Sequence, residues 1–280
     1  MFMKACARMR KVETVIVLDT LSMALPVVVA ARLFGNKAIV RVGGDFVWEQ
    51  YVERTKEKVA LSEFYEANPR LSTKERLALW LQRKVVIPLA DALVFSTEWQ
   101  RSIWASPYRL SDARVNIIEN AYLPNVSRVS RSESPHAVVW IGRDIVLKNV
   151  STLDRAVDLV RNEVPNFEYE KYSSIAHKEV IEVLGRSRVL VIPSISEVSP
   201  NLVLEALALQ VPVLLTRDCG LARMLEYAVT LVDPLDAEDI ASHIREIMTE
   251  EGYRVARERA ASFVSTRTYS EVADEFLLLL

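Results

Sequence analysis

Two glutamates stand eight positions apart where a buried strand gives way to a helix. Glu197 and Glu205 follow the apolar run 189–192, which is typical of a strand covered on both faces. Ser199 is a good N-cap, and Pro200 fits the first helical position because its missing N–H would be unpaired there anyway. The helix is therefore expected to begin just beyond Glu197, with both carboxylates near its start.

The first backbone amides of this helix can bind an anion. From about Asn201 and Leu202 onward, N–H groups would point into the crevice at the carboxyl end of the preceding strand, where a diphosphate fits. At a rise of ~1.5 Å per helical residue, the two carboxylates lie on the order of 10 Å apart. That separation suits two ends of an extended ligand. The alternative is that both glutamates are solvated charges beside an amphipathic helix.

A second group of cationic residues follows the predicted strand 137–141. Gly142 and Arg143 come directly after this strand, and Lys148 and Asn149 open the next helix. Open α/β sheets bind ligands at the carboxyl ends of their strands. Arginine can hold a phosphate with two N–H groups, and lysine adds a point charge. Together they could neutralise a diphosphate, whereas a single arginine or lysine is more simply a solvated surface charge.

These two segments resemble a known family. Glu197-x7-Glu205, followed by Ala206 and by Pro212-Val213, is similar to the signature of the family 4 retaining glycosyltransferases, the glycosyl transferases of group 1. The resemblance implies the GT-B fold, an α/β architecture of two Rossmann-like domains that face a cleft. It extends from about residue 15 to the C-terminus and is most specific between 142 and 213.

The resemblance also implies roles for individual residues. Arg143 and Lys148 would hold the diphosphate of a nucleotide-sugar donor, Glu197 would contact the sugar, and Glu205 would contact the ribose. The family more often has glycine where Asn149 stands. The remaining residues expected to line the donor site are Gly142, Asn149, Ser199, Pro200, Asn201 and Leu202.

Such a site requires no metal and no cofactor other than the donor substrate. Cleavage of a nucleotide sugar builds negative charge on the β-phosphate, and fixed cations with a helix N-terminus can stabilise that charge in a dry cleft. No Asp-x-Asp metal motif stands near the expected site. We therefore expect metal-independent transfer, and the resemblance implies that the transferred group is a hexosyl group.

The first half of the chain offers a weaker candidate in residues 40–49. Gly43-Gly44 follows a predicted strand and allows the backbone to approach a ligand closely. The segment looks like the acceptor-side loop of the family, in which many members have a histidine. Asp45 is the nearest ionisable residue to touch donor sugar or acceptor, and a helix cap or turn is the alternative. Nearby aromatic residues suit either an acceptor platform or the core: Trp48, Tyr51 and Phe64.

Composition excludes several classes of protein. The chain has 280 residues, half of them hydrophobic, which is enough for two cores. A net charge of −2 without a basic stripe argues against nucleic acid as a partner. Two distant cysteines, Cys6 and Cys219, fit a reducing cytoplasm. The basic residues among the first thirteen could touch the inner face of a membrane, although a solvated terminus is the simpler interpretation. The sequence does not set the oligomeric state.

Short β-branched runs alternate with helical patterns, which predicts βαβ units on parallel sheets. The expected strands are 14–18, 38–42, 92–95, 115–118, 137–141, 167–172, 189–192, 213–215 and 230–232. Linker composition near 120–135 predicts an acceptor-side domain over 1–128 and a nucleotide-sugar domain over 129–265. The terminal helix, 266–280, is expected to return to the first domain.

Two features of the family are missing from the sequence. The opening strand with its glycine-rich turn does not precede residue 14, and no Gly-x-Gly turn follows 167–172. We therefore expect an incomplete first domain.

The leading hypothesis is a retaining glycosyltransferase that acts on a saccharide or lipid-linked acceptor in assembly of cell-envelope polysaccharide or glycolipid. The alternatives are a non-catalytic relative that binds a nucleotide or a partner and, less favoured, a sugar-nucleotide epimerase. A glycoside hydrolase is weaker still because its carboxyl pair should stand ~5–9.5 Å apart.

Overall fold

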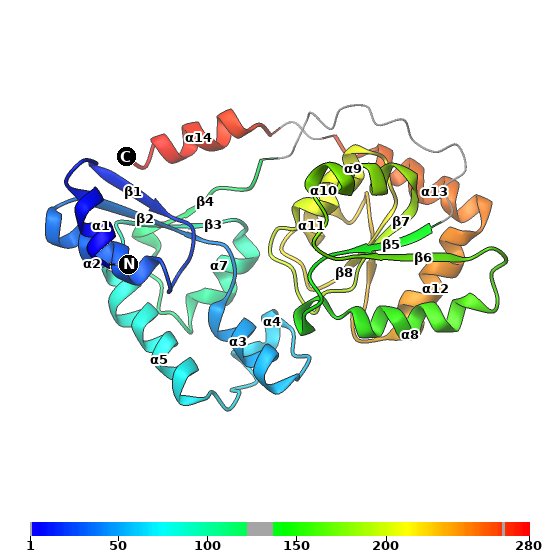
Figure 1. Cartoon of the computed structure of the whole chain (residues 1–280), viewed down its shortest axis with the longest axis horizontal. Helices are drawn as coiled ribbons and strands as arrows, with labels where there is room; N and C mark the ends of the chain where they lie inside the picture. The colour runs from blue at the N-terminus through cyan, green and yellow to red at the C-terminus, as the bar shows by residue number, and fades with distance from the viewer. Residues whose placement is uncertain (1, 122–136, 265–266) are drawn as a thin grey trace. The chain divides into compact units, whose positions relative to one another are not determined.

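The computed structural model of the chain describes residues 2–121, 137–264 and 267–280. It comprises two compact units, one formed by Met1–Asn120 with Tyr269–Leu280 and the other by Ala121–Thr268 (Figure 1). The expected boundary at residue 128 lies outside the described residues. Within the described ranges, no helix has the length and apolar character needed to cross a membrane.

The first unit contains a parallel sheet of four strands in the order β1-β2-β3-β4. The strands are β1 (Thr14–Val17), β2 (Lys37–Val42), β3 (Ala92–Phe95) and β4 (Val115–Ile117). The helices of this unit are α1 (Phe2–Met9), α2 (Ala24–Phe34), α3 (Phe46–Thr55), α4 (Leu61–Phe64), α5 (Thr73–Leu81), the π-helical turn η1 (Gln82–Val86), α6 (Ile87–Leu89), α7 (Glu98–Ala105), η2 (Asp112–Arg114) and α14 (Tyr269–Leu277).

The second unit contains a parallel sheet of five strands in the order β6-β5-β7-β8-β9. The strands are β5 (Ala137–Ile141), β6 (Glu168–Tyr172), β7 (Ser187–Ile192), β8 (Val213–Thr216) and β9 (Thr230–Val232). The helices are η3 (Val146–Lys148), α8 (Val150–Arg161), α9 (His177–Arg186), α10 (Asn201–Ala208), α11 (Ala222–Leu225), α12 (Ala237–Met248) and α13 (Glu250–Ala261). Each expected strand is present within two residues of its predicted bounds, and the α/β class with parallel sheets is confirmed.

Apolar side chains cover both faces of the second sheet, and this explains why residues 189–192 of β7 are all apolar. Successive residues of a strand point to opposite faces. Leu190 packs among side chains of α9 and α10, whereas its neighbours Val189 and Val191 pack among those of α8 and α12. These three side chains are fully buried. A central parallel strand therefore positions the loop that follows it with little freedom.

Helix α14 belongs to the first unit although it lies at the end of the chain. Val272 and Phe276 of α14, together with Leu279 just beyond its end, pack against a cluster of buried residues: Ile39, Ala92, Val94 and Ile118. The guanidinium of Arg41 lies 5.5 Å from the centroid of the Phe276 ring. The apolar C-terminal helix thus covers one face of the first sheet.

We expect Phe276→Ala to lower the free energy of unfolding of the first unit by about 2 kcal/mol, because a half-buried ring loses its packing and its cation–π contact. Denaturant titration would measure the change. Leu278→Ala is the matched control, since that side chain is 86% exposed. Equal effects of the two substitutions would show that Phe276 does not stabilise the first unit through its packing.

Candidate functional site

The order of strands reverses at β5 in the second sheet. The chain passes from β5 to β6 on one side and then returns to β7 on the other side of β5. Sheets of this type bind ligands outside the carboxyl ends of the strands at such a reversal. The loop after β5 carries Arg143 and Lys148, and the loop after β7 carries Glu197. The topology therefore brings together two segments that were singled out separately from the sequence.

Lys148 and Glu197 form an ion pair at this reversal. The Lys148 Nζ lies 2.5 Å from Glu197 Oε1, and Ser194 Oγ donates a hydrogen bond of 2.6 Å to the same oxygen. The side chains of Lys148 and Glu197 are 30% and 13% exposed. Burial of this kind strengthens the pair but requires each charge to keep a partner. A bound diphosphate would compete with Glu197 for Lys148, and a sugar hydroxyl would compete for Glu197.

The backbone of Glu197 is held by the loop that follows β8. Its N–H donates to the carbonyl of Asp218 at 3.0 Å, and its carbonyl accepts from Gly220 N–H at 2.9 Å. Glu197 and Cys219 form an isolated parallel bridge. Burial raises the pKa of the Cys219 thiol to about 12, so the thiol is neutral and serves as packing. Two loops joined in this way fix where the Glu197 side chain starts.

Asn149 positions Lys148 instead of presenting its own side chain. It is 1% exposed and adopts a left-handed backbone with φ of 50°. Its Nδ2 donates to the carbonyls of Pro193 at 2.9 Å and Pro234 at 2.5 Å, while Oδ1 accepts from Thr152 at 2.8 Å. The amide thus ties the Lys148 loop to the ends of β7 and β9. Contact of Asn149 with a donor stays a prediction.

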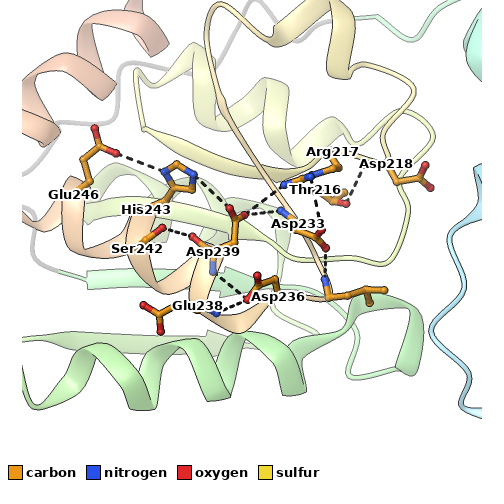
Figure 2. A network of polar contacts seen from close by, with 11 residues as sticks. Thr216, Arg217, Asp218, Asp233, Asp236, Glu238, Asp239, Ser242, His243 and Glu246 are labelled. Atoms are coloured by element: carbon orange, nitrogen blue, oxygen red, sulfur yellow. Dashed lines mark hydrogen bonds and ion pairs between the residues drawn. The ribbon is translucent and has the colours of Figure 1, made fainter.

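The loop after β9, whose Pro234 carbonyl accepts a hydrogen bond from Asn149, is held by a network of charges (Figure 2). Arg217 lies 3.7 Å from Asp233 and 3.8 Å from Asp239. Asp239 also accepts the N–H of Asp233 at 2.7 Å, and Asp236 caps α12. Opposite charges pair within the network, which therefore supports the loop after β9.

Glu205 lies in the middle of α10 and meets a residue that sequence reasoning missed. Its Oε1 is 3.0 Å from Nε2 of His177, the first residue of α9. Glu205 is 7% exposed, whereas the side chain of His177 is 63% exposed. A signal for His177 was present, since a polar residue that opens the helix after β6 lies at the same edge of a parallel sheet as Glu197.

The helix after Glu197 starts one residue later than expected. Pro200 is the N-cap, with φ of −76° and ψ of 105°, and α10 begins at Asn201. The prediction of Ser199 as N-cap is wrong, because Pro200 takes an extended backbone and so ends the loop instead of opening the helix. The segment that follows β7 contains four residues expected at the donor site: Ser199, Pro200, Asn201 and the half-buried Leu202. Their contact with a donor stays a prediction.

Gly142 and Arg143 lie in the loop after β5. The N–H of Gly142 donates to the carbonyl of Tyr172 at 3.0 Å, and a Cβ on Gly142 would lie 3.1 Å from the Trp140 ring. Close packing therefore favours glycine at this position. Arg143 is exposed. Its guanidinium is accessible to an anion, and its role in phosphate binding stays a prediction.

Asp45 is a fully buried cap in the first unit. Its Oδ1 accepts the N–H of Trp48 at 3.0 Å, and its Oδ2 accepts the hydroxyl of Tyr65 at 2.7 Å. The hydroxyl of Tyr108 lies 3.2 Å from both oxygens. Burial raises the pKa of Asp45 although these hydrogen bonds oppose it, and burial also raises the pKa of Tyr65 and Tyr108 well above the ordinary value. The capping interpretation describes this carboxylate, and its contact with a substrate stays a prediction.

The aromatic residues near Asp45 belong to the core. Trp48, Tyr51 and Phe64 are at most 5% exposed, so the acceptor-platform interpretation is wrong. A cavity of about 130 Å³ opens instead beside Gly43 and Gly44. Its walls include Asp19, Thr20, Ser22, Phe46 and Glu49.

Residues 168–263 match the family model of glycosyl transferases group 1. This segment extends from β6 to just beyond α13 and contains Glu197 and Glu205, whereas Arg143 and Lys148 precede it. No curated protein is similar enough in sequence to match the chain.

Solved structures match nearly the whole chain. Anabaena HepE in complex with UDP and glucose is 10% identical with a TM-score of 0.73, and the match covers 99% of this chain and 80% of that one. WaaG, a glycosyltransferase involved in lipopolysaccharide biosynthesis, is 16% identical with a TM-score of 0.69, covering 99% and 80%. Sucrose-phosphate synthase from Thermosynechococcus elongatus is 15% identical with a TM-score of 0.68, covering 98% and 74%. The chain has the α/β fold of the GT-B glycosyltransferases.

Asp45 makes the stability of the first unit depend on pH. Because its pKa is raised, the contribution of Asp45 to stability is full below the ordinary value of 3.8 and is lost as pH rises through the raised value. Asp45→Asn keeps a capping oxygen without the charge. We expect the free energy of unfolding of the wild type to fall relative to that of Asp45→Asn as pH rises above the ordinary value of 3.8 in denaturant titrations. A difference that rises with pH would contradict the burial cost.

Proposed function

We propose that this protein is a retaining glycosyltransferase that moves a sugar from a nucleotide-sugar donor to a saccharide or lipid-linked acceptor. The observation that carries the proposal is the cluster of Lys148, Glu197 and Ser194 at the strand reversal of the second sheet. The match of residues 168–263 to glycosyl transferases group 1 supports the same reaction class. Anabaena HepE, which shares the fold, was solved with UDP and glucose.

The proposed chemistry follows from the charges in this cluster. When the bond between the anomeric carbon and the phosphate oxygen breaks, negative charge builds on the departing diphosphate. Lys148 and Arg143 would stabilise that charge, and the N-terminus of α10 would add a favourable dipole. Glu197, released from Lys148 by the diphosphate, would accept a hydrogen bond from a sugar hydroxyl. The acceptor hydroxyl oxygen forms the new bond to the anomeric carbon, and its proton passes to the oxygen of the departing diphosphate.

The acceptor would occupy the cavity beside Gly43 and Gly44. Asp19 accepts the backbone N–H groups of Leu21, Met23 and Ala24, so the amides at the start of α2 are occupied by a carboxylate. Burial opposes the charge of Asp19, but the hydrogen bond from the Ser22 hydroxyl and these backbone bonds together lower its pKa, which keeps the carboxylate charged. The cavity therefore suits neutral hydroxyl groups better than a phosphate.

The proposal includes a hexosyl donor, metal-independent transfer and a place in assembly of cell-envelope polysaccharide or glycolipid. WaaG, which shares the fold, is a glycosyltransferase involved in lipopolysaccharide biosynthesis, and this supports the setting by analogy. A lipid-linked acceptor would require the protein to work at the cytoplasmic face of a membrane.

A non-catalytic relative that binds a nucleotide is the second candidate. The observation that favours it is the burial of Asp45, which occupies the acceptor-side loop and has its carboxylate committed to three donors. Such a protein would bind a nucleoside diphosphate without turnover. An epimerase would instead convert the nucleotide sugar in the absence of any acceptor, so product analysis without acceptor separates it from a transferase.

Arg143→Ala and Lys148→Ala should each weaken nucleotide binding by roughly 10-fold or more, because each removes a charge-assisted contact to phosphate. Calorimetric titration with UDP, GDP and ADP would identify the base and measure the loss. Arg161→Ala is a charge-matched control, since Arg161 is 58% exposed at the far end of α8. Unchanged affinity in both site variants would refute the phosphate assignment.

Glu197→Ala should abolish transfer while leaving nucleoside diphosphate affinity within about 3-fold, because Glu197 is assigned to the sugar and not to the phosphates. Turnover would be followed by release of the nucleoside diphosphate once an acceptor is found. Full activity of the variant would remove Glu197 from the mechanism. Nucleotide binding without turnover in the wild type, across the acceptors tested, would favour the non-catalytic candidate.

A further inference from the structure

We propose that His177 is a positioning residue of the nucleotide site, which holds the Glu205 carboxylate in the orientation that receives the two adjacent hydroxyl groups of a ribose. The inference rests on the proposed function, which assigns Glu205 to the ribose and gives His177 no role. Three observations support it: the burial of Glu205, the exposure of His177, and the way in which the start of α9 is fixed.

The carboxylate of Glu205 is buried on a helix that is otherwise apolar on its inner side. Neighbouring residues of α10, including Val203, Leu204 and Leu207, belong to the apolar layer over the sheet. A carboxylate in such surroundings is costly unless it is hydrogen-bonded. His177 supplies a bond of 3.0 Å to Oε1. The buried carboxylate therefore has one oxygen committed to an imidazole.

His177 itself is not held in place by burial. Its side chain is 63% exposed, so packing does not explain its orientation. The backbone at the start of α9 is fixed instead, because Glu179 accepts the N–H of Ala176 at 3.0 Å and Ser174 adopts a left-handed φ of 60°. A fixed backbone and an exposed ring place one imidazole nitrogen against Glu205 and leave the rest of the ring open to a ligand.

The pair has the hydrogen-bonding capacity that a vicinal diol needs. A carboxylate oxygen has two lone pairs, so Oε1 can accept from His177 and still accept one hydroxyl, while Oε2 accepts the other. For Nε2 to donate, the neutral imidazole must carry its proton on Nε2, and Nδ1 is then an acceptor. Holding the carboxylate in one rotamer before the ligand arrives reduces the entropy that binding must overcome.

The location agrees with the rest of the site. Helices α9 and α10 cover the same face of the second sheet, and the loops that precede them both leave the carboxyl ends of their strands (Figure 1). His177 begins the helix after β6, and Glu205 lies on the helix after β7. The pair is therefore on the same sheet edge as Lys148, where the diphosphate is proposed to bind.

The test compares a ribonucleotide with its analogue that lacks both ribose hydroxyls. Calorimetry would give Kd for UDP, or for the base that binds, and for the 2′,3′-dideoxy form. We expect His177→Ala to raise the Kd of the ribonucleotide by about 5- to 10-fold and that of the dideoxy analogue by less than about 2-fold. His177→Gln, which keeps an N–H donor, should recover at least half of the lost affinity. Glu205→Ala should remove the preference for the ribonucleotide altogether.

Lys178→Ala is the matched control, because Lys178 is the next residue of α9, is 89% exposed and pairs with Glu182 on its own helix. It should leave both affinities unchanged. Thermal unfolding of every variant would show whether a loss of binding follows a loss of fold.

Two results would overturn the inference while leaving the proposed function intact. One is equal weakening of both nucleotides by His177→Ala, and the other is no weakening while Glu205→Ala still abolishes the ribose preference. A wild type that binds both nucleotides equally would contradict the assignment of Glu205 to the ribose. A wild type that binds no nucleotide would overturn the proposed function and this inference together.

Discussion

The contact between Lys148 and Glu197 is the interaction on which the site depends. It joins two residues 49 positions apart in the sequence, and it exists because β5 and β7 are neighbours in the sheet although β6 lies between them in the chain. Each charge is the partner of the other in a half-buried environment. Removal of one would leave the other partly desolvated without a compensating charge. In the proposed function, an anionic, hydroxyl-rich ligand replaces both contacts at once.

The surroundings of this pair are built to keep it in place. Asn149 anchors the loop of Lys148 to the ends of two strands, and backbone bonds to the loop after β8 anchor Glu197. These anchors use buried amide and peptide groups whose hydrogen-bonding capacity is met within the unit. Residues other than Lys148 and Glu197 therefore fix the two loops, and the paired side chains stay partly exposed.

The sequence was sufficient to predict the framework of the second unit. The apolar run of β7 could be recognised because a parallel strand is buried on both faces, and the segment before Lys148 followed the same pattern. Spacing then placed the cations and glutamates after strands that prove to be neighbours. Sheet order was the missing element, since one-dimensional periodicity does not specify which strands pair.

Features that depend on the competition between local groups could not be predicted in the same way. Asn149 looked like a ligand contact, but its burial and left-handed backbone direct its amide inward. For Asp45 the sequence left a substrate contact and a helix cap as alternatives; the structure shows the cap, and two tyrosines from distant parts of the first unit enclose the carboxylate. His177 had only its place after β6 as a signal, because its contact with α10 is created by the fold.

The most direct test of this account is a crystal structure of the chain with a bound nucleoside diphosphate. The account predicts phosphate oxygens within hydrogen-bonding distance of Lys148 and Arg143, with the Glu197 carboxylate displaced from Lys148 and the ribose hydroxyls on Glu205. A nucleotide bound elsewhere, with the contact between Lys148 and Glu197 unchanged, would contradict the central claim that this ion pair marks the donor site.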